Sequence, residues 1–144
     1  MSEPFILDDF LPYQLSVAAG RVSQEFARHY EDMFGISRAE WRVVAHLSQV
    51  TAVSVREIHA RVDMDKPKVS RAATRLEEAG YITKRINGTD RRLVELALTQ
   101  KGQKMVAQLT PIAQRYQAEL IGRLGRDATR FQAGIAMILP RSET

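Results

Sequence analysis

The chain has 144 residues, 44% hydrophobic and 26% charged, so it is long enough to bury one core but short for two independent cores. It contains no cysteine, which excludes disulfides, thiolate metal sites and thiol nucleophiles. No apolar stretch approaches the roughly 20 residues that span a bilayer, and the first nine residues carry the acidic Glu3, Asp8 and Asp9 instead of the basic start of a signal peptide. We therefore expect a single cytoplasmic unit over residues 1–144.

The net charge of +4 is concentrated in one part of the chain. Residues 66–92 hold eight basic and three acidic side chains, which is a net +5 and leaves −1 for the remainder. A local basic segment is what a nucleic-acid footprint requires, whereas a uniform excess of basic residues says little about partners.

The first predicted elements are two helices. Apolar residues recur at spacings of three and four over residues 11–34, which predicts one long amphipathic helix, and Gly35 is a stop signal. Ser37 stands three residues before Glu40, a reciprocal capping pair that satisfies free amides at a helix start. A second helix is therefore expected over about 38–49.

Two shorter helices follow. Ser54 and Glu57 repeat the capping pair and open a helix over about 55–62. Asp65 can cap the next helix, which Gly80 ends. Two short helices joined by a tight turn predict a helix-turn-helix, whose second helix enters the major groove of DNA.

A hairpin and a long helical region complete the chain. Residues 81–86 and 93–98 are rich in β-forming side chains, and the turn residues between them predict a hairpin. Thr99 can cap a last helix with a long apolar stripe, which Gly125 breaks. The expected fold is mainly α with a small β-hairpin wing (α+β), with the winged helix-turn-helix over residues 37–98.

Long apolar stripes stand at both ends of the chain, over residues 11–34 and 100–140. So small a protein has little core for them to cover, and pairing with the same helices of a second copy would bury both. We expect them to be dimerisation helices of a homodimer. Packing within one chain is the alternative.

The predicted second helix of the motif has two different faces. Val69, Ala72, Ala73 and Leu76 fall at the offsets of a buried face. The DNA-binding candidates on the other faces are Lys66, Lys68, Ser70, Arg71, Thr74 and Arg75.

These candidates suit different parts of DNA. Arg71 and Ser70 are the base-contact candidates, because arginine donates two parallel hydrogen bonds to guanine and a serine hydroxyl can meet base edges. Lys66 and Lys68 lie in the first turn, where ammonium groups and free amides favour phosphate. The alternative for each is an ordinary solvated helix face.

The predicted hairpin adds four DNA-binding candidates, Arg85, Asp90, Arg91 and Arg92. Two guanidinium groups at a thin tip can reach a minor groove. Asp90 would hold the Arg92 side chain in one rotamer and so lower the entropy lost on binding. As an ordinary polar turn, the same residues would mean little.

Three motifs occur in order along the chain. Residues 75–82 read Arg-Leu-Glu-Glu-Ala-Gly-Tyr-Ile, residues 90–92 read Asp-Arg-Arg, and residues 98–102 read Leu-Thr-Gln-Lys-Gly. Over nearly its full length the chain resembles the multiple antibiotic resistance regulator (MarR) family, in which these motifs are the recognition-helix end, the wing and the start of the following helix.

The resemblance implies a homodimer whose terminal helices interleave and whose two winged domains read a roughly palindromic operator. In that family's pattern Arg92 matches the wing arginine, Asp90 its acidic partner, and Lys68 to Arg75 the groove-facing helix. The resemblance also favours repression of transcription.

Members of the family often release DNA when a small aromatic or phenolic anion binds between the dimerisation helices and the winged domain. The candidates for such a site mix aromatic surface with cationic or hydrogen-bonding groups; they are Tyr13, His29, Trp41, Arg42 and His46. The alternative is that the aromatic residues belong to the core and the histidines are ordinary polar residues.

Other functions fit less well. An enzyme is not expected, because the chain lacks a phosphate loop, a His-Glu metal motif and a nucleophile elbow. Its three histidines show no metal-ligand spacing, so neither a metal nor a cofactor is predicted. Nonspecific architectural DNA binding stays open because phosphate contacts alone could explain the basic segment. A winged domain used for protein interaction is a third possibility.

Overall fold

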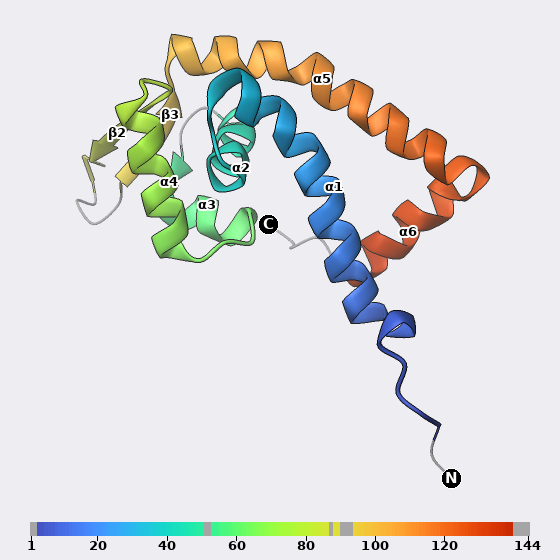
Figure 1. Ribbon diagram of the computed structural model, residues 1–144. Helices are drawn as coiled ribbons and strands as arrows, with labels where there is room; N and C mark the ends of the chain where they lie inside the picture. Colours follow the sequence, from blue (N-terminus) through green and yellow to red (C-terminus); the bar gives the residue numbers. More distant parts are fainter. Residues whose placement is uncertain (1–2, 51–52, 87, 90–93, 140–144) are drawn as a thin grey trace. The chain divides into compact units, whose positions relative to one another are not determined.

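The computed structural model describes residues 3–50, 53–86, 88–89 and 94–139. It is mainly helical with a small antiparallel sheet, as the sequence predicts (Figure 1). The chain forms two compact units, residues 1–109 and residues 110–144. Among the described residues, no helix combines the length and apolar character needed to cross a membrane.

The helices of the first unit are η1 (Leu7–Asp9), α1 (Leu11–Phe34), α2 (Arg38–Leu47), α3 (Val55–Arg61), α4 (Lys66–Glu78) and the beginning of α5 (Gln100–Leu124). All but the short 3-10 helix η1 are predicted from the sequence. The order of one long helix, three short ones, a hairpin and another long helix is therefore confirmed.

The predicted helix boundaries rest on caps that the structure contains. Gly35 ends α1 with φ 68°, a left-handed conformation that glycine adopts without a steric cost. At the start of α2, the Ser37 hydroxyl accepts from the Glu40 amide at 3.2 Å and the Glu40 carboxylate accepts from the Ser37 amide at 2.7 Å. At the start of α3, the Ser54 hydroxyl accepts from the Glu57 amide at 3.2 Å.

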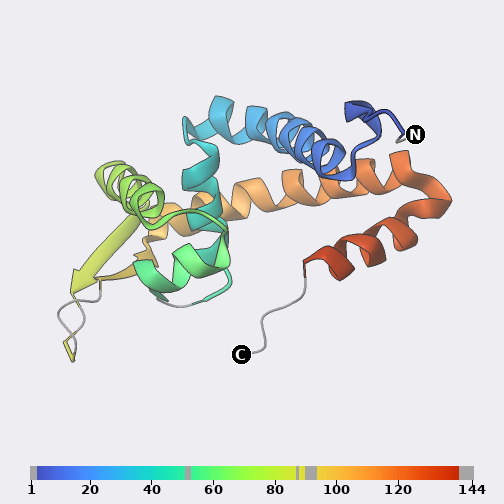
Figure 2. The same ribbon diagram turned by 90° about the horizontal axis from the view of Figure 1, so that it is seen from below.

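The sheet has three strands, β1 (Val53–Ser54), β2 (Ile82–Ile86) and β3 (Val94–Leu98), in the order β1-β3-β2. Both pairs are antiparallel, with Ile82 opposite Leu98 in the hairpin. In Figure 2 the β2–β3 hairpin extends away from the helices of its unit. The hairpin is predicted from the sequence, whereas β1 is not, because two residues are too few to show an alternating pattern.

The core of the first unit lies beneath the helix-turn-helix. Its most deeply buried side chains, none more than 2% exposed, include Val43, Val44, Leu47, Ile58, Val69, Ala72, Ala73, Leu76 and Leu96. The beginning of α5 adds Met105 and Leu109, and α1 adds Ala27 and Tyr30. The predicted apolar face of the second helix of the motif is therefore buried as expected.

The second unit contains the rest of α5, the 3-10 helix η2 (Gly125–Asp127) and α6 (Ala128–Ile138). The break after α5 falls at Gly125 (φ 59°), as predicted. Pro111 stands inside α5; because proline has no amide hydrogen, the i to i−4 bond of the ladder is missing there. Of the residues described in this unit, only Ala128 is buried.

Candidate nucleic-acid interface

The helix-turn-helix is made by α3 and α4 with a short turn between them. In that turn Asp63 has φ 54°, a left-handed conformation that aspartate tolerates better than most residues. The His59 ring nitrogen Nδ1 lies 2.6 Å from the Met64 carbonyl oxygen, and it acts as the donor because the carbonyl can only accept. Asp65 caps α4 by accepting from the Lys68 amide at 2.8 Å. The start of α4 is thus held by local hydrogen bonds.

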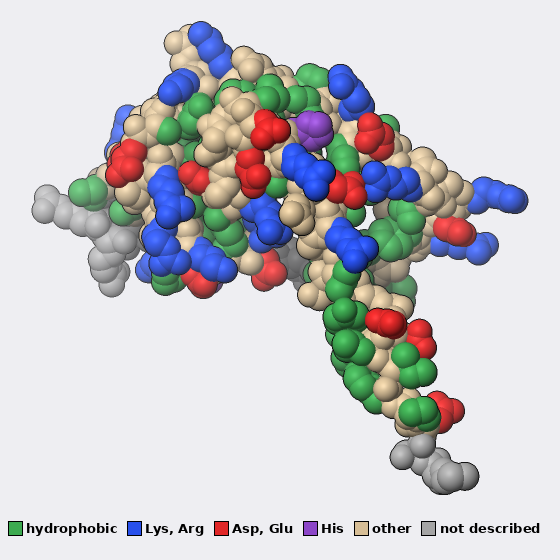
Figure 3. Space-filling model, viewed as in Figure 1, with side chains coloured by type: hydrophobic (Ala, Val, Ile, Leu, Met, Phe, Trp, Pro, Cys, Tyr) green, Lys and Arg blue, Asp and Glu red, His purple; other side chains and the backbone are tan. Residues whose placement is uncertain are grey.

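One face of α4 is open to solvent. All six candidates predicted on this helix are exposed: Lys66, Lys68, Ser70, Arg71, Thr74 and Arg75. In Figure 3 Lys and Arg side chains gather over α4. Within the described part of the chain, none of the four cations has a side-chain hydrogen bond or ion pair. Their charges are therefore available to an anionic partner.

A shallow groove of about 370 Å³ runs along this face of α4, lined by Ser70, Arg71, Thr74, Arg75 and Glu78. Glu78 is not among the sequence-predicted site residues. Its spacing of three from Arg75 and four from Thr74 is the signal that could have found it, because residues so spaced share a helix face. A carboxylate in the groove opposes phosphate and can accept from the amino group of cytosine.

A second missed residue, Lys84, contacts the same face from β2. Its ammonium donates to the Thr74 hydroxyl at 2.8 Å, and that hydroxyl donates to the Ser70 carbonyl at 3.0 Å. The Lys84 amide also donates to the Glu77 carboxylate at 3.2 Å. Thr74 is therefore already engaged by protein groups, and one lone pair is left for DNA. The pair lies ten residues apart on two elements, so no sequence spacing signals it.

The wing is described along its two strands and at residues 88–89. Arg85 is exposed on β2 and lies opposite Glu95 of β3. The other predicted wing candidates, Asp90, Arg91 and Arg92, fall outside the residues that the structure describes. Their role in DNA binding stays a prediction from the sequence.

A small pocket lies between α1 and α2 in the same unit. It has a volume of about 110 Å³ and is lined by Ser23, Phe26, Tyr30, Arg38, Trp41 and Arg42. The rings of Tyr30 and Trp41 stack at 5.5 Å with an interplanar angle of 16°, and Phe26 meets both edge-on. Burial raises the pKa of the Tyr30 phenol to about 12, with the Glu31 carboxylate a lesser cause. The phenol is therefore neutral at physiological pH.

Two of the five predicted ligand residues, Trp41 and Arg42, line this pocket. Tyr13 is exposed at the start of α1, and the exposed His29 ring lies 6.4 Å from that of Phe26. His46 lies half-buried on α2. The structure thus does not place these three in the pocket lining.

The lining residues that the sequence reasoning missed are Ser23, Phe26, Tyr30 and Arg38. Those on α1 recur at spacings of three and four, which is also the pattern of an ordinary core face.

The half-buried His46 has one buried ring nitrogen that makes no hydrogen bond. Among the described residues, its Nε2 atom is the only buried side-chain nitrogen or oxygen without a hydrogen-bond partner. Burial lowers the pKa of this histidine, and the Arg61 guanidinium lowers it further while the Glu57 carboxylate opposes the shift. The described residues contain no group of three or more histidine, aspartate or glutamate side chains placed to hold a metal ion.

Comparisons with known proteins agree with this geometry. The MarR family model matches residues 34–93, which span the helix-turn-helix and most of the wing. The Escherichia coli HTH-type transcriptional regulator PapX is 27% identical over 121 residues, or 83% of this chain and 74% of PapX.

Two solved structures are similar over almost the whole chain. The transcriptional repressor CouR, bound to a 23-mer DNA duplex, has a TM-score of 0.80 at 25% identity over 97% of this chain and all of CouR. Bordetella bronchiseptica BpsR, whose DNA binding is regulated by 6-hydroxynicotinic acid, has a TM-score of 0.83 at 19% identity over 98% of this chain and all of BpsR. In its helix-turn-helix, wing and exposed basic face the chain is therefore similar to transcriptional regulators of the MarR family, whose model it matches over residues 34–93.

Proposed function

We propose that the protein is a homodimeric repressor that reads a palindromic operator with α4 and leaves it when a small aromatic ligand binds. The observation that carries this proposal is the exposed face of α4, where four cations have no partner among the described residues. The phosphates of DNA can neutralise the cations of this face, and base edges can form hydrogen bonds with its side chains.

The roles along α4 follow from position and chemistry. Lys66 and Lys68 lie in the first turn and neutralise phosphates, with help from the free amides of the helix start. Arg71 and Ser70 lie further along the same exposed face and meet base edges. Arg85 on the wing strand adds a further cation. The predicted wing-tip arginines, Arg91 and Arg92, would reach the flanking minor groove.

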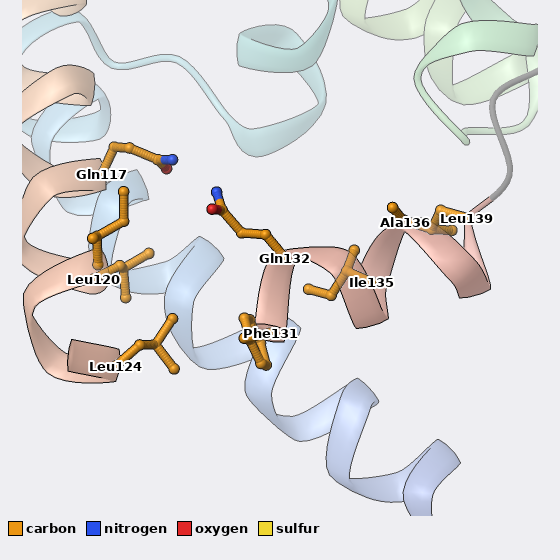
Figure 4. Close-up of a pocket in the computed structure, with 9 residues that line it drawn as sticks. Gln117, Leu120, Leu124, Phe131, Gln132, Ile135, Ala136 and Leu139 are labelled. Carbon is orange, nitrogen blue, oxygen red and sulfur yellow. The ribbon is translucent and has the colours of Figure 1, made fainter. Parts of the chain in front are cut away.

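The homodimer is proposed from apolar surface at both ends of the chain. A groove of about 570 Å³ in the second unit is lined mainly by apolar side chains of α5 and α6, including Leu120, Leu124, Phe131 and Ile135 (Figure 4). Near the other end Phe5, Ile6, Leu7, Phe10 and Leu11 are all exposed. Exposed apolar side chains gathered in this way are typical of interaction surfaces. Two copies related by a twofold axis would read an inverted repeat.

Repression and ligand release are proposed on further observations. CouR, similar over nearly the whole chain, is a repressor. The pocket between α1 and α2 combines stacked rings with two guanidinium groups, which suits the ring and the carboxylate of an aromatic acid. Its size of about 110 Å³ is on the scale of the roughly 150 Å³ cavity that holds benzene. A coupling of ~1–3 kcal/mol between pocket and DNA would change operator affinity about 5–150-fold.

The proposal is tested by selecting bound sequences from a random duplex library with the purified protein at near-physiological salt. We expect one inverted-repeat motif, because a twofold dimer with base-reading arginines prefers one sequence. Recovery of no motif, with binding lost steeply as salt rises, would instead support nonspecific architectural binding.

Ligand binding is tested separately through Trp41, which lines the pocket and is the only tryptophan of the chain. Titration with benzoate and 4-hydroxybenzoate should change its fluorescence and weaken operator binding. The matched variant Arg42→Met should lose both responses, while Arg28→Met, on the exposed part of α1 and outside the pocket lining, should keep them. Unchanged fluorescence in the wild-type protein would argue against this pocket as the ligand site.

A further inference from the structure

The end of α4 is closed by a compact set of backbone hydrogen bonds. The Gly80 amide donates to the Glu77 carbonyl at 3.0 Å and the Tyr81 amide donates to the Leu76 carbonyl at 2.9 Å. Gly80 has φ 86°, so α4 ends in a Schellman motif. In this motif two of the last helix carbonyls accept hydrogen bonds from the residues that follow the helix. The carbonyls of Ala79, Gly80 and Tyr81 still need donors.

The beginning of α5 supplies all three donors. The Thr99 amide donates to the Tyr81 carbonyl at 3.0 Å, and the Thr99 hydroxyl donates to the Gly80 carbonyl at 2.6 Å. The Lys101 ammonium donates to the Ala79 carbonyl at 2.6 Å. Three consecutive carbonyls directly after α4 are thus bound by three donors of two residues, Thr99 and Lys101, at the start of α5. We name this arrangement the α4–α5 clasp.

Two further contacts tighten the clasp. A Cβ atom on Gly102 would lie 2.2 Å from the Tyr81 carbonyl oxygen, so only glycine allows this approach of α5 to the backbone after α4. The Lys101 ammonium also lies 4.6 Å from the centre of the buried Tyr81 ring, a cation–π contact. The Tyr81 ring in turn meets Phe34 of α1 edge-on at 6.5 Å. The residues after α4 are therefore held from two helices.

We propose that Thr99 and Lys101 are positioning residues that act through the backbone of α4 to hold the recognition helix at a fixed orientation to the start of α5. A displacement of α5 would then pass to α4, and Arg71 would move relative to the bases. The inference rests on the proposed function of α4 as the base-reading helix. It assigns to Lys101 a role other than phosphate binding, because its ammonium is already bound to a carbonyl and an aromatic ring.

The test compares Lys101→Met with Lys104→Met on the operator selected above. Both variants remove one positive charge from the first turns of α5, and Lys104 is exposed and has no side-chain partner among the described residues. Lys101→Met should weaken operator binding by about tenfold, the scale of one charge-assisted hydrogen bond. Binding to random duplex DNA should change no more than in Lys104→Met, since phosphate contacts are retained.

The salt dependence separates positioning from direct contact. If Lys101 only positions α4, the slope of log affinity against log salt stays at the wild-type value, whereas loss of a phosphate contact lowers it by about one unit. A second pair, Thr99→Val and Thr99→Ser, removes or keeps the hydroxyl that binds Gly80, and only the valine variant should lose operator preference. Thermal unfolding checks that every variant compared is folded at the assay temperature.

Each result bears either on the α4–α5 clasp alone or on the clasp together with the proposed function. Equal operator affinities for Lys101→Met and Lys104→Met overturn the clasp while leaving the proposed function in place. A reduced salt slope for Lys101→Met also overturns it, because Lys101 is then a phosphate contact. A wild-type protein without operator preference contradicts the proposed function and the clasp together.

Discussion

The winged region, residues 37–98, and the ends of the chain differ in how much apolar surface they cover. In the winged region Val44 of α2, Ile58 of α3 and Leu76 of α4 are fully buried. In the second unit Phe131 is 46% exposed and Met137 84% exposed. The winged region therefore completes its core within one chain, with Tyr30, Met105 and Leu109 from the flanking helices, while the second unit leaves most of its apolar side chains exposed.

If the protein forms the proposed homodimer, the two parts should respond differently to concentration. Burial within one chain is independent of how many molecules are present, whereas burial between two copies follows mass action. Substitutions in the two regions should therefore be distinguishable by dilution, and the largest expected effect comes from the closed core.

Leu76→Ala should destabilise the protein by about 2–5 kcal/mol, because it leaves a cavity beneath α4 where the wild-type side chain is fully buried. Urea unfolding measures the loss, which should be the same at every protein concentration. Leu11→Ala, at an exposed position of α1, is the matched control, and its cost should shrink on dilution. Equal, concentration-independent costs at both positions would remove the distinction between the two regions.

Phe131→Asp should weaken self-association by about tenfold or more, since it places a charge in the apolar groove of the second unit. Sedimentation velocity over a dilution series measures this. Thr129→Asp adds the same charge at an exposed position of α6 outside the groove lining and should leave association unchanged. An unaltered dimer in both variants would place the interface elsewhere.

Arg71→Ala should leave stability unchanged and relax sequence preference at one operator position by ~1–3 kcal/mol. The reason is that Arg71 is exposed in the groove along α4 and contributes nothing to the core. Binding to operators mutated position by position measures the effect, with Arg28→Ala on α1 as the charge-matched control. A uniform loss on all sequences would make Arg71 a phosphate contact.

The smallest effect concerns His46, where the closed core of the winged region holds a buried nitrogen without a partner. Its pKa is lowered in the folded state, so the unfolded chain binds more protons once the pH falls below the ordinary histidine value of 6.5. Stability is therefore fully present above pH 6.5 and decreases as the pH falls through the lowered pKa. Urea unfolding at pH 7.5 and 5.5 should show a smaller decrease for His46→Gln than for the wild-type protein, and equal decreases would contradict this account.

Much of the fold follows from local signals in the sequence. Glycines at the ends of helices, the pair Ser37 and Glu40, and the cap Asp65 act within a few residues, and each occurs in the structure where it is expected. Strand β1 is missed because its two residues are defined only by pairing with β3, far along the chain. The 3-10 helix η1 is missed because it is a single short turn.

The candidate functional surfaces also contain features that local sequence predicts and features that it does not. The exposed and buried faces of α4 are predictable because helical periodicity alone separates them. The contact of Lys84 with Thr74 and the hydrogen bonds of Thr99 and Lys101 to the end of α4 are not, because they join elements that are distant in sequence. The pocket is found only in part for the same reason: Trp41 and Arg42 are candidates by residue type, while Phe26 and Tyr30 become pocket residues only when α1 packs on α2.

Pro111 gives α5 an uneven stiffness. A helix with a complete hydrogen-bond ladder resists bending along its whole length, and the bond missing at Pro111 concentrates bending at that turn. Thr99 and Lys101 lie before this turn, so the part of α5 that is hydrogen-bonded to the residues after α4 is separated by Pro111 from the later part of the helix. A torque applied beyond Pro111 is therefore partly absorbed as bending of α5 before it can turn α4.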